Sequence, residues 1–264
     1  MNQIKYVVKS HERSDRFRLK TYNKIILKYK FDLKNTFVFV STEDDFNLYK
    51  SKYPEINIVK GPRGVSAIDN FITEYFDADQ KIIYMNDDVS GIYGITENLK
   101  EYEVGQIELN NLINKSFEIM TENRISYGGL YPVLNSLFMS GGDELKFDFG
   151  LIMDPFSFVI NNKKINITIS DKSDFEKSIL HFRDRGALLR FNRYGLKVEY
   201  YGKNGGFQGR DKSTELKTAI NLIRKYPNYC NGVNVKNGGK TSIRFNKIKT
   251  KKKITYKGKI INFE

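Results

Sequence analysis

The sequence has few of the residues that build disulfide frameworks and histidine-rich metal sites. Its 264 residues include one cysteine, Cys230, and two histidines. A single cysteine excludes an intramolecular disulfide and a zinc site with several cysteine ligands. Two histidines are too few for a metal site built mainly from imidazoles.

Long apolar runs are also missing. The chain has no stretch of about 18 apolar residues, and no apolar, charge-fronted leader opens at Met1. We therefore expect no membrane span and a cytoplasmic location.

The residues that are present are typical of a folded protein. The hydrophobic fraction is 40%, with 19 Phe and 17 Tyr, which argues against global disorder. A chain of this length fits one large α/β domain, or one domain with a small appendage.

Positive charge is concentrated near the end of the chain. Between residues 240 and 259 there are nine lysines or arginines and no acidic residue, so this segment supplies most of the formal net charge of +13. Such an excess suggests an anionic partner, although a lysine run is also typical of a solvated tail. Five apolar or aromatic residues interleave with the charges and favour an ordered strand: Ile243, Phe245, Ile248, Ile254 and Tyr256.

The first hundred residues alternate short apolar runs with helical patterns. The predicted strands cover residues 4–8, 36–41, 57–60 and 81–85. The predicted helices cover residues 15–28, 46–52 and 66–76. Strands joined by single helices imply right-handed crossovers and a mainly parallel sheet, whose ligands bind at the carboxyl ends of the strands. A polar loop follows each of the four predicted strands.

The second half of the chain indicates a mixed or antiparallel arrangement. Helices are predicted over residues 107–123, 174–186 and 214–225. Strands are predicted over residues 125–128, 147–153, 156–160, 165–170 and 197–201. We expect one continuous domain, with a donor half at residues 1–104 and an acceptor half at 105–239, followed by the basic segment 240–264.

A candidate metal site follows the fourth predicted strand. The apolar run ends in Asn86, Asp87 and Asp88, and a turn is expected at residues 90–91. Paired carboxylates at a strand end repel each other unless a cation neutralises them, and Mg²⁺ or Mn²⁺ with substrate phosphates does so. The pair would then act like the DxD motif of GT-A glycosyltransferases. A loop or helix cap is the alternative interpretation of the same residues.

Two earlier loops are candidates for binding a nucleotide. Ser10, His11 and Arg13 follow the first strand, where a nucleobase, ribose or phosphate could lie, although exposed charges at a helix start explain them equally well. Arg63 and Gly64 precede the third helix and could contact phosphates, or could form an ordinary connection.

A candidate base begins the helix predicted over residues 174–186. The 4-3-4 spacing of Asp174, Ser178, His181 and Arg185 puts them on one helix face. Asp174, or Asp171 as second choice, could deprotonate an acceptor hydroxyl. The alternative is a capped amphipathic helix with a wet polar face, on which His181 is solvated.

The order of these segments resembles the GT-A glycosyltransferases associated with TET/JBP dioxygenases, found in phages and in the kinetoplastid base J pathway. The N-terminal motifs of the resemblance are Ser10-His11-Glu12-Arg13, residues 64 to 70, and Asn86-Asp87-Asp88. The later motifs are Asp174-Phe175-Glu176, residues 182 to 186, Arg190-Phe191-Asn192, Gly205-Gly206-Phe207-Gln208 and Lys225-Tyr226-Pro227.

The resemblance implies a GT-A fold that transfers a sugar, often glucose, from a UDP donor to the hydroxymethyl group of a modified pyrimidine in DNA. Asp88, helped by Asp87, would hold Mn²⁺ or Mg²⁺, and Gly205 to Gln208 would form a loop over donor or acceptor. The family commonly has Arg-Asn where this chain has Asp69 and Asn70, so Arg63 would substitute for that arginine. Asn86 replaces the first acid of the usual acidic triplet.

The nucleotide-sugar residues expected from all these observations are Ser10, His11, Arg13, Arg63, Gly64, Asn70, Asn86 and Asp87. The residues expected to contact a DNA backbone are Lys240, Arg244, Lys247, Lys249 and Lys251. Two rival functions remain open: the same fold acting on a glycan or protein, and a non-catalytic nucleic-acid-binding domain with a decayed donor site.

Overall fold

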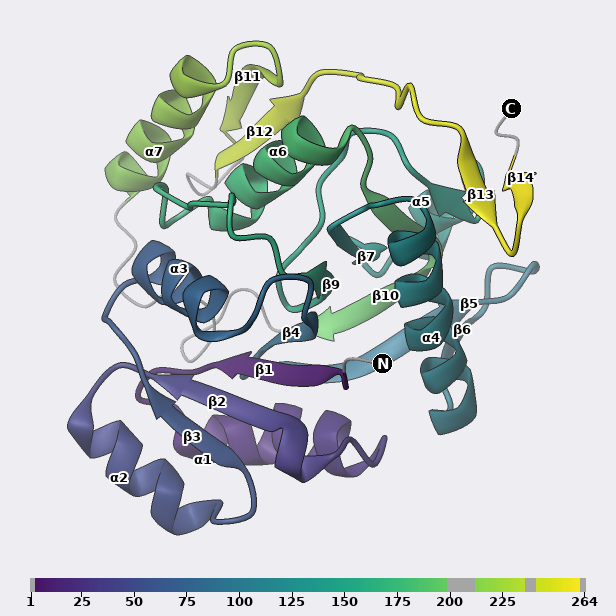
Figure 1. Ribbon diagram of the computed structural model, residues 1–264. Coiled ribbons are helices and arrows are strands. Elements are labelled where there is room, and N and C mark those ends of the chain that lie inside the picture. The colour runs from purple at the N-terminus through teal and green to yellow at the C-terminus, as the bar shows by residue number, and fades with distance from the viewer. Residues whose placement is uncertain (1–2, 199–211, 236–240, 262–264) are drawn as a thin grey trace.

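The computed structural model describes residues 3–198, 212–235 and 241–261. A ten-stranded sheet lies at its centre, in the order β3-β2-β1-β4-β9-β7-β10-β5-β6, with β8 paired to β10 (Figure 1). The strands are β1 (Lys5–Lys9), β2 (Thr36–Val40), β3 (Asn57–Lys60), β4 (Lys81–Asn86), β5 (Val89–Ile95), β6 (Glu101–Glu103), β7 (Tyr127–Tyr131), β8 (Leu145–Lys146), β9 (Phe156–Ile160) and β10 (Leu189–Val198).

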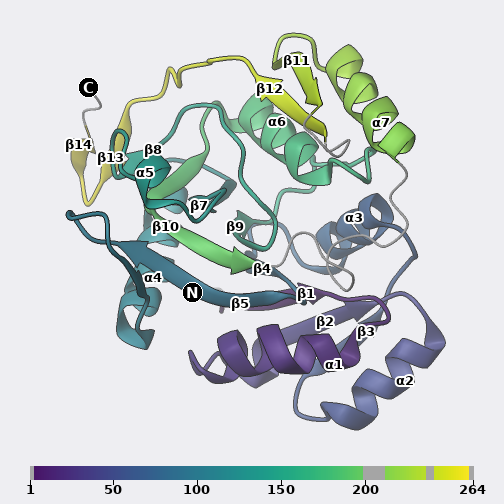
Figure 2. The same cartoon turned by 180° about the vertical axis from the view of Figure 1, so that it is seen from behind.

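Helices cover both faces of this sheet (Figures 1 and 2). They are α1 (Ser14–Phe17), which continues into the π-helical segment η1 (Arg18–Leu27), the short η2 (Leu33–Asn35), α2 (Glu43–Lys52), α3 (Val65–Tyr75), α4 (Gln106–Glu122), α5 (Ser136–Met139), α6 (Ser173–Arg185) and α7 (Lys212–Lys225). None of these described helices is long and apolar enough to cross a bilayer.

Successive side chains of each strand point to opposite faces, which divides the core in two. Val8 and Met85 pack with Phe17 of α1, Tyr49 of α2 and Leu109 of α4 on one face. On the other face Val7 and Tyr84 pack with residues of α3, α6 and α7, including Ile72, Ile179 and Leu222. The sheet is therefore buried on both sides, as a mainly parallel sheet requires.

The strands of the N-terminal half are parallel, as the alternating pattern predicts. β1 pairs in parallel with β2 and β4, and β2 with β3. All four therefore end at one edge of the sheet, which we call the carboxyl edge. Beyond β4 the sheet is mixed, because β9 is antiparallel to β4 and β7, while β10 is parallel to β7 and antiparallel to β5.

Three sequence predictions of local structure are wrong. The turn expected at residues 90–91 is part of β5, and the strands expected at residues 147–153 and 165–170 are not formed. Side chains satisfy much of the backbone there: Ser178 Oγ accepts from Ile152 N, and the Glu176 carboxylate accepts from the backbone N–H groups of Thr168 and Ile169. The apolar pattern of these segments reflects burial against α6, not strand pairing.

The C-terminal segment is packed against the domain over its described part. A hairpin of β11 (Cys230–Val235) and β12 (Thr241–Phe245) lies beside α7, and Phe245 packs on Phe149 with ring centroids 4.5 Å apart. The chain then runs to a second hairpin, β13 (Ile254–Tyr256) and β14 (Lys259–Ile261), where Ile254 is buried in the core. The interleaved apolar residues are thus anchors, and the expectation of ordered strand is confirmed for Ile243, Phe245, Ile254 and Tyr256 but not for Ile248.

Candidate functional site at the carboxyl edge

Asp87 and Asp88 form a tight connection at the carboxyl edge. They lie between the last residue of β4, Asn86, and the first of β5, Val89, and both side chains are buried. Thr21 of η1 fastens this connection, because its Oγ1 donates to the carbonyl of Asn86 at 2.6 Å and accepts from the N–H of Val89 at 3.1 Å. Two carboxylates are thereby held side by side where β1 and β4 end.

The Asp87 side chain is oriented by the loop that follows β1. Ser10 Oγ donates to Asp87 Oδ2 at 2.6 Å and lies 2.6 Å from the Tyr49 hydroxyl, which is the donor in that contact because the Ser10 proton is already used. Burial raises the pKa of Asp87 to about 6, the Ser10 hydrogen bond lowers it, and the neighbouring Asp88 raises it. The raised pKa of Asp87 thus reflects mainly its burial.

Two arginines at the start of the first helix face the carboxylates. Arg13 Nη1 lies 3.6 Å from Asp87 Oδ1, and Arg16 Nη2 lies 3.5 Å from Asp88 Oδ2. Both arginines also line a cleft of about 530 Å³ between the first helix and α2. Cations at this distance can turn toward a diphosphate that enters the cleft.

The donor set suits a hard divalent cation shared with a substrate. Within the described residues no group of three or more His, Cys, Asp or Glu side chains is placed to hold a metal. The protein would therefore supply one or two carboxylate oxygens, and phosphate oxygens and water would complete the coordination, as Mg²⁺ and Mn²⁺ prefer. The raised pKa of Asp87 fits this arrangement, because a bound cation would replace the proton.

His11 lies beside the pair but has a local partner. Its Nδ1 is 2.9 Å from Ser41 Oγ, and its side chain is 41% exposed. Asp45, nearby, accepts from the backbone N–H of Glu12 at 2.9 Å and so holds the loop after β1. Ser10, His11 and Arg13 are thus brought to one place with Asp87.

Arg63, Gly64 and Asn70 lie around the start of α3. Arg63 is exposed, and Gly64 precedes the helix with φ at +106°, a conformation that strongly favours glycine. The Asn70 amide is used by the main chain of Ile167, donating to its carbonyl at 2.8 Å and accepting from its N–H at 2.7 Å. In this structure Asn70 therefore fastens residues 165–169 and does not face Asp87 or Asp88.

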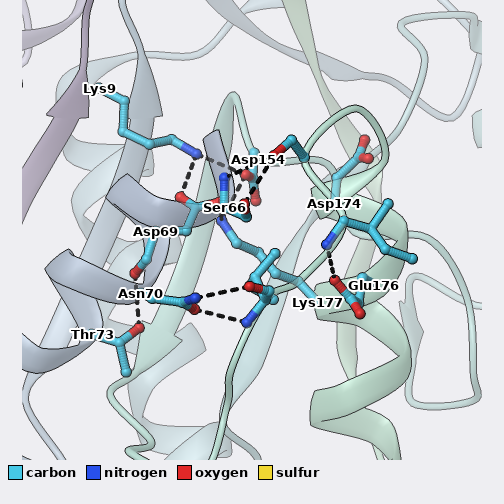
Figure 3. Close-up of polar contacts among 12 residues, drawn as sticks. Lys9, Ser66, Asp69, Asn70, Thr73, Asp154, Asp174, Glu176 and Lys177 are labelled. Carbon is cyan, nitrogen blue, oxygen red and sulfur yellow. Dashed lines mark hydrogen bonds and ion pairs between the residues drawn. The ribbon is translucent and has the colours of Figure 1, made fainter. Parts of the chain in front are cut away.

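A buried ring of four charges lies at the same edge on the other face of the sheet (Figure 3). Lys9 Nζ contacts Asp69 at 2.7 Å and Asp154 at 3.0 Å, and Lys177 Nζ contacts Asp69 at 2.9 Å and Asp154 at 2.7 Å. The Tyr127 hydroxyl donates to Asp154 at 2.9 Å. Burial alone would raise the pKa of Asp154, but Lys177 and Lys9 outweigh it and hold the pKa well below its usual range.

Sequence reasoning missed this ring, because its members come from four distant segments and none belongs to a recognisable motif. The one signal in the sequence was Asp69, an acid where the family that the motifs resemble commonly has an arginine. In this structure Asp69 contacts two lysines, Lys9 of β1 and Lys177 of α6.

Asp174 stands next to this ring at the start of α6. Its side chain is partly buried, and its Oδ1 accepts from the N–H of Phe175 at 3.0 Å. Burial, and then the charge of Asp154, raise the pKa of Asp174 to about 6. A carboxyl group with such a pKa is suited to take a proton near neutral pH. Asp171, the second choice, is also partly exposed and lies in the loop before the helix.

The interpretation of α6 as a helix with a solvent-exposed polar face is wrong for Ser178 and His181. Ser178 is fully buried, and His181 is 4% exposed, stacked on Tyr127 with centroids 4.7 Å apart and in contact with Ser126 Oγ at 2.8 Å. Burial, reinforced by Lys177, lowers the pKa of His181 to about 3. This histidine is a neutral core residue.

Two of the motifs that carry the resemblance, at residues 174–176 and 225–227, contact each other. Glu176 is fully buried and accepts from Thr168, Ile169, Lys225 and Tyr226. It therefore joins α6 to the end of α7.

Other expected site residues are either not described or not at this edge. Gly205, Gly206, Phe207, Gln208 and Lys240 fall outside the described residues. The last residue of β10, Val198, pairs with Val89, which directly follows Asp88. Arg244 is exposed on β12 and donates to Asn234.

Lys247, Lys249 and Lys251 lie at the edge opposite the carboxyl edge. β7 and β10 run in the same direction as β4 and so begin at that opposite edge, and α6 ends at Gly186 shortly before β10. Thr250, between these lysines, donates to the Gly186 carbonyl. The length of α6, about 20 Å for its 13 residues, therefore separates them from Asp174.

Comparison with solved structures identifies the fold. The chain is similar to a mannosyltransferase from Pyrobaculum calidifontis, PcManGT, in complex with GDP-Man and Mn²⁺ (TM-score 0.50, 10% identity, 85% of this chain and 63% of that one). It is also similar to GalNAc-T7 with UDP, GalNAc and Mn²⁺ (TM-score 0.52, 11% identity, 86% of this chain and 48% of that one). No family model and no curated protein matches the sequence.

The fold is that of the GT-A glycosyltransferases, which confirms the α/β architecture expected from the sequence. The chain spans about two thirds and about half of the lengths of these two proteins.

Proposed function

We propose that this protein is a metal-dependent glycosyltransferase that uses a nucleotide-diphosphate sugar as donor. The observation that carries the proposal is the buried Asp87–Asp88 pair at the carboxyl edge of a GT-A sheet, beside a cleft lined by Arg13 and Arg16. The similar solved structures contain GDP-Man or UDP together with Mn²⁺, which supports this class of donor and cofactor.

Each residue of the site has a distinct role in this proposal. Asp88 and Asp87 would hold the divalent cation, which when bound would supply positive charge for the departing diphosphate. Ser10 keeps Asp87 in the ligating orientation. Arg13 and Arg16 add positive charge where the leaving group accumulates negative charge. Arg13 in the cleft and the exposed His11 in the same loop contact the nucleotide.

Asp174 is the base for the acceptor. It takes the proton of the acceptor hydroxyl while that oxygen bonds to the anomeric carbon and the bond from this carbon to the diphosphate breaks. The raised pKa of Asp174 makes it a stronger base than an ordinary aspartate while leaving it mostly ionised above pH 7. Asp171 is the alternative base.

For the acceptor, we propose the hydroxymethyl group of a modified pyrimidine in DNA, with UDP-glucose as donor. This rests on the resemblance of the motifs to the TET/JBP-associated family and on the net charge of +13. DNA must reach the carboxyl edge, where the exposed Arg63 would meet phosphates that flank the reacting base.

The experiment is a donor and acceptor screen with purified protein and Mn²⁺. UDP- and GDP-sugars are supplied with DNA that contains hydroxymethylated cytosine or uracil, with unmodified DNA, and with glycan or peptide acceptors. Transfer to hydroxymethylated DNA alone supports the whole proposal. Transfer only to a glycan or peptide would support the proposed donor and contradict the proposed DNA acceptor. Absence of any metal-dependent nucleotide binding would favour a decayed donor site.

A further inference from the structure

The chain between β12 and β13 presents lysines in a regular row. Residues 247 to 254 alternate strictly between outward and inward positions, and the outward ones, all exposed lysines, are Lys247, Lys249, Lys251 and Lys253. We call these four residues the lysine row. Figure 1 shows the segment that carries it as the yellow connection from β12 to β13.

Backbone and side-chain contacts hold the first part of this segment against the protein. The carbonyl of Ile248 accepts from the N–H of Phe149 at 3.0 Å. Thr250 donates its N–H to Asp148 at 2.9 Å and its hydroxyl to the Gly186 carbonyl at 2.8 Å.

The second part is anchored to the end of α4. Lys252, which points inward, donates to the carbonyl of Asn123 at 2.8 Å, and Thr255 N–H donates to Asn123 Oδ1 at 2.8 Å. Ile254 is 1% exposed. The inward residues therefore hold the row rigid, which a solvated lysine tail does not need.

The positive charge of the row is largely uncompensated. No acidic residue occurs between positions 240 and 259. Among the described residues, Lys249 alone of the four has a carboxylate within ion-pair distance, that of Asp148 at 3.0 Å. Holding like charges in line is unfavourable unless an anion binds there.

We propose that the lysine row binds the phosphodiester backbone of a nucleic acid, at a surface separate from the donor site. The row offers four like charges along one short stretch of chain, and each strand of duplex DNA carries one negative charge about every 3.4 Å of its axis, so several lysines can contact phosphates at once.

A nucleic acid fits this row better than an anionic membrane does. Membrane-surface segments place apolar side chains toward the lipid next to their lysines. Here the apolar residues of the segment, Ile248 and Ile254, face the protein. What the row offers outward is charge alone, as sequence-independent binding to phosphates requires.

The position of the row gives it a tethering role. It lies at the edge opposite Asp174, about 20 Å away along α6, so a short acceptor in the active site cannot touch both. A long nucleic acid can bind the row with one part while another part enters the site, which raises the local concentration of acceptor. This tethering role, unlike the binding itself, rests on the proposed function.

The test compares two variants with the same change in charge. One replaces Lys247, Lys249, Lys251 and Lys253 by Gln. The control replaces four exposed lysines outside the segment, Lys24, Lys34, Lys50 and Lys100, by Gln. Unmodified duplex DNA of roughly 30 base pairs is titrated by fluorescence anisotropy over a salt series, without donor.

The row variant should lose at least about tenfold in affinity at low salt, and the slope of log affinity against log salt should become shallower by about 3 units. The control should stay within about threefold of the parent protein, and both variants should keep its melting temperature. Equal losses in the two variants, or none in the row variant, would overturn the proposal. So would tighter row-dependent binding to vesicles of 30% phosphatidylserine than to DNA.

Metal-dependent UDP binding, measured by calorimetry, separates this proposal from the proposed function. The row variant should bind UDP with Mn²⁺ as the parent does. If DNA binding depends on the row but no acceptor DNA is ever modified, the surface stands and the acceptor assignment fails. If hydroxymethylated DNA is modified but the row variant binds DNA normally, the acceptor assignment stands and the lysine-row surface fails.

Discussion

Replacing Asp174 by Asn should make the protein more stable at alkaline pH and leave its stability almost unchanged in acid. Burial and Asp154 raise the pKa of Asp174 from 3.8 to about 6. The folded protein therefore binds this proton more tightly than the unfolded chain does. Ionised Asp174 therefore destabilises the folded protein. This effect is absent below pH 4, grows as the pH rises from about 4 to 6, and is complete above that range.

The shift of about two pH units corresponds to about 3 kcal/mol of unfolding free energy. Because the Asp174 side chain is partly exposed, solvent screening reduces this figure, and we expect a gain of about 1 to 2 kcal/mol at pH 8. For a chain of this size that gain raises the melting temperature by several degrees.

The assay is thermal unfolding of the parent protein and the Asp174→Asn variant at pH 4 and pH 8, with Asp171→Asn, in the loop before α6, as a control. A variant that is less stable than the parent at both pH values, or equally stabilised at both, would refute the burial argument. Turnover tests the same residue as a base: it should fall by roughly a hundredfold or more while UDP binding persists.

Three further predictions follow from the same contacts. Mn²⁺-dependent UDP affinity should fall as the pH drops through about 6, because the proton on Asp87 competes with the metal. Ser10→Ala should move this fall to higher pH, because it removes a hydrogen bond to the Asp87 carboxylate. Calorimetry across pH checks both, and a pH-independent affinity would contradict the metal role. Glu176→Ala should destabilise the protein by about 3 to 5 kcal/mol in urea unfolding, because several buried hydrogen-bond donors lose their acceptor. A loss below about 1 kcal/mol would show that these donors bind water instead. Truncation after Gly239 should give an unfolded or aggregated product by circular dichroism, because it removes Phe245 and Ile254 from the core; a cooperative melt near that of the full chain would disprove this.

The donor half of the fold could be predicted from the sequence because its signals are local. Each strand from β1 to β4 is a short apolar run, and each following helix has its own period, so the order of elements determines a parallel sheet. The carboxyl ends of those strands then bring Ser10 and Asp87 together, although 77 residues separate them.

The remaining features depend on contacts between distant segments. Residues 165–170 have a strand-like apolar pattern, but Glu176 and Asn70 bind their backbone. His181 has helical spacing typical of an exposed face, yet Tyr127 and Ser126 cover it. The charge ring at Lys9 and the position of the lysine row likewise follow from tertiary packing that no single-sequence pattern encodes.

The most direct test of the central claim is calorimetric titration of the protein with UDP and with GDP, in Mn²⁺ and in a chelator, for the parent protein and for Asp88→Asn. Asp88 lies in a connection at the sheet edge, so this substitution removes a charge without opening the core. We predict that one of the two nucleotides binds in Mn²⁺, that a chelator abolishes this binding, and that Asp88→Asn abolishes it with the melting temperature maintained. Equal binding in a chelator, or undiminished binding by Asp88→Asn, would contradict a metal-dependent nucleotide-sugar site at this position.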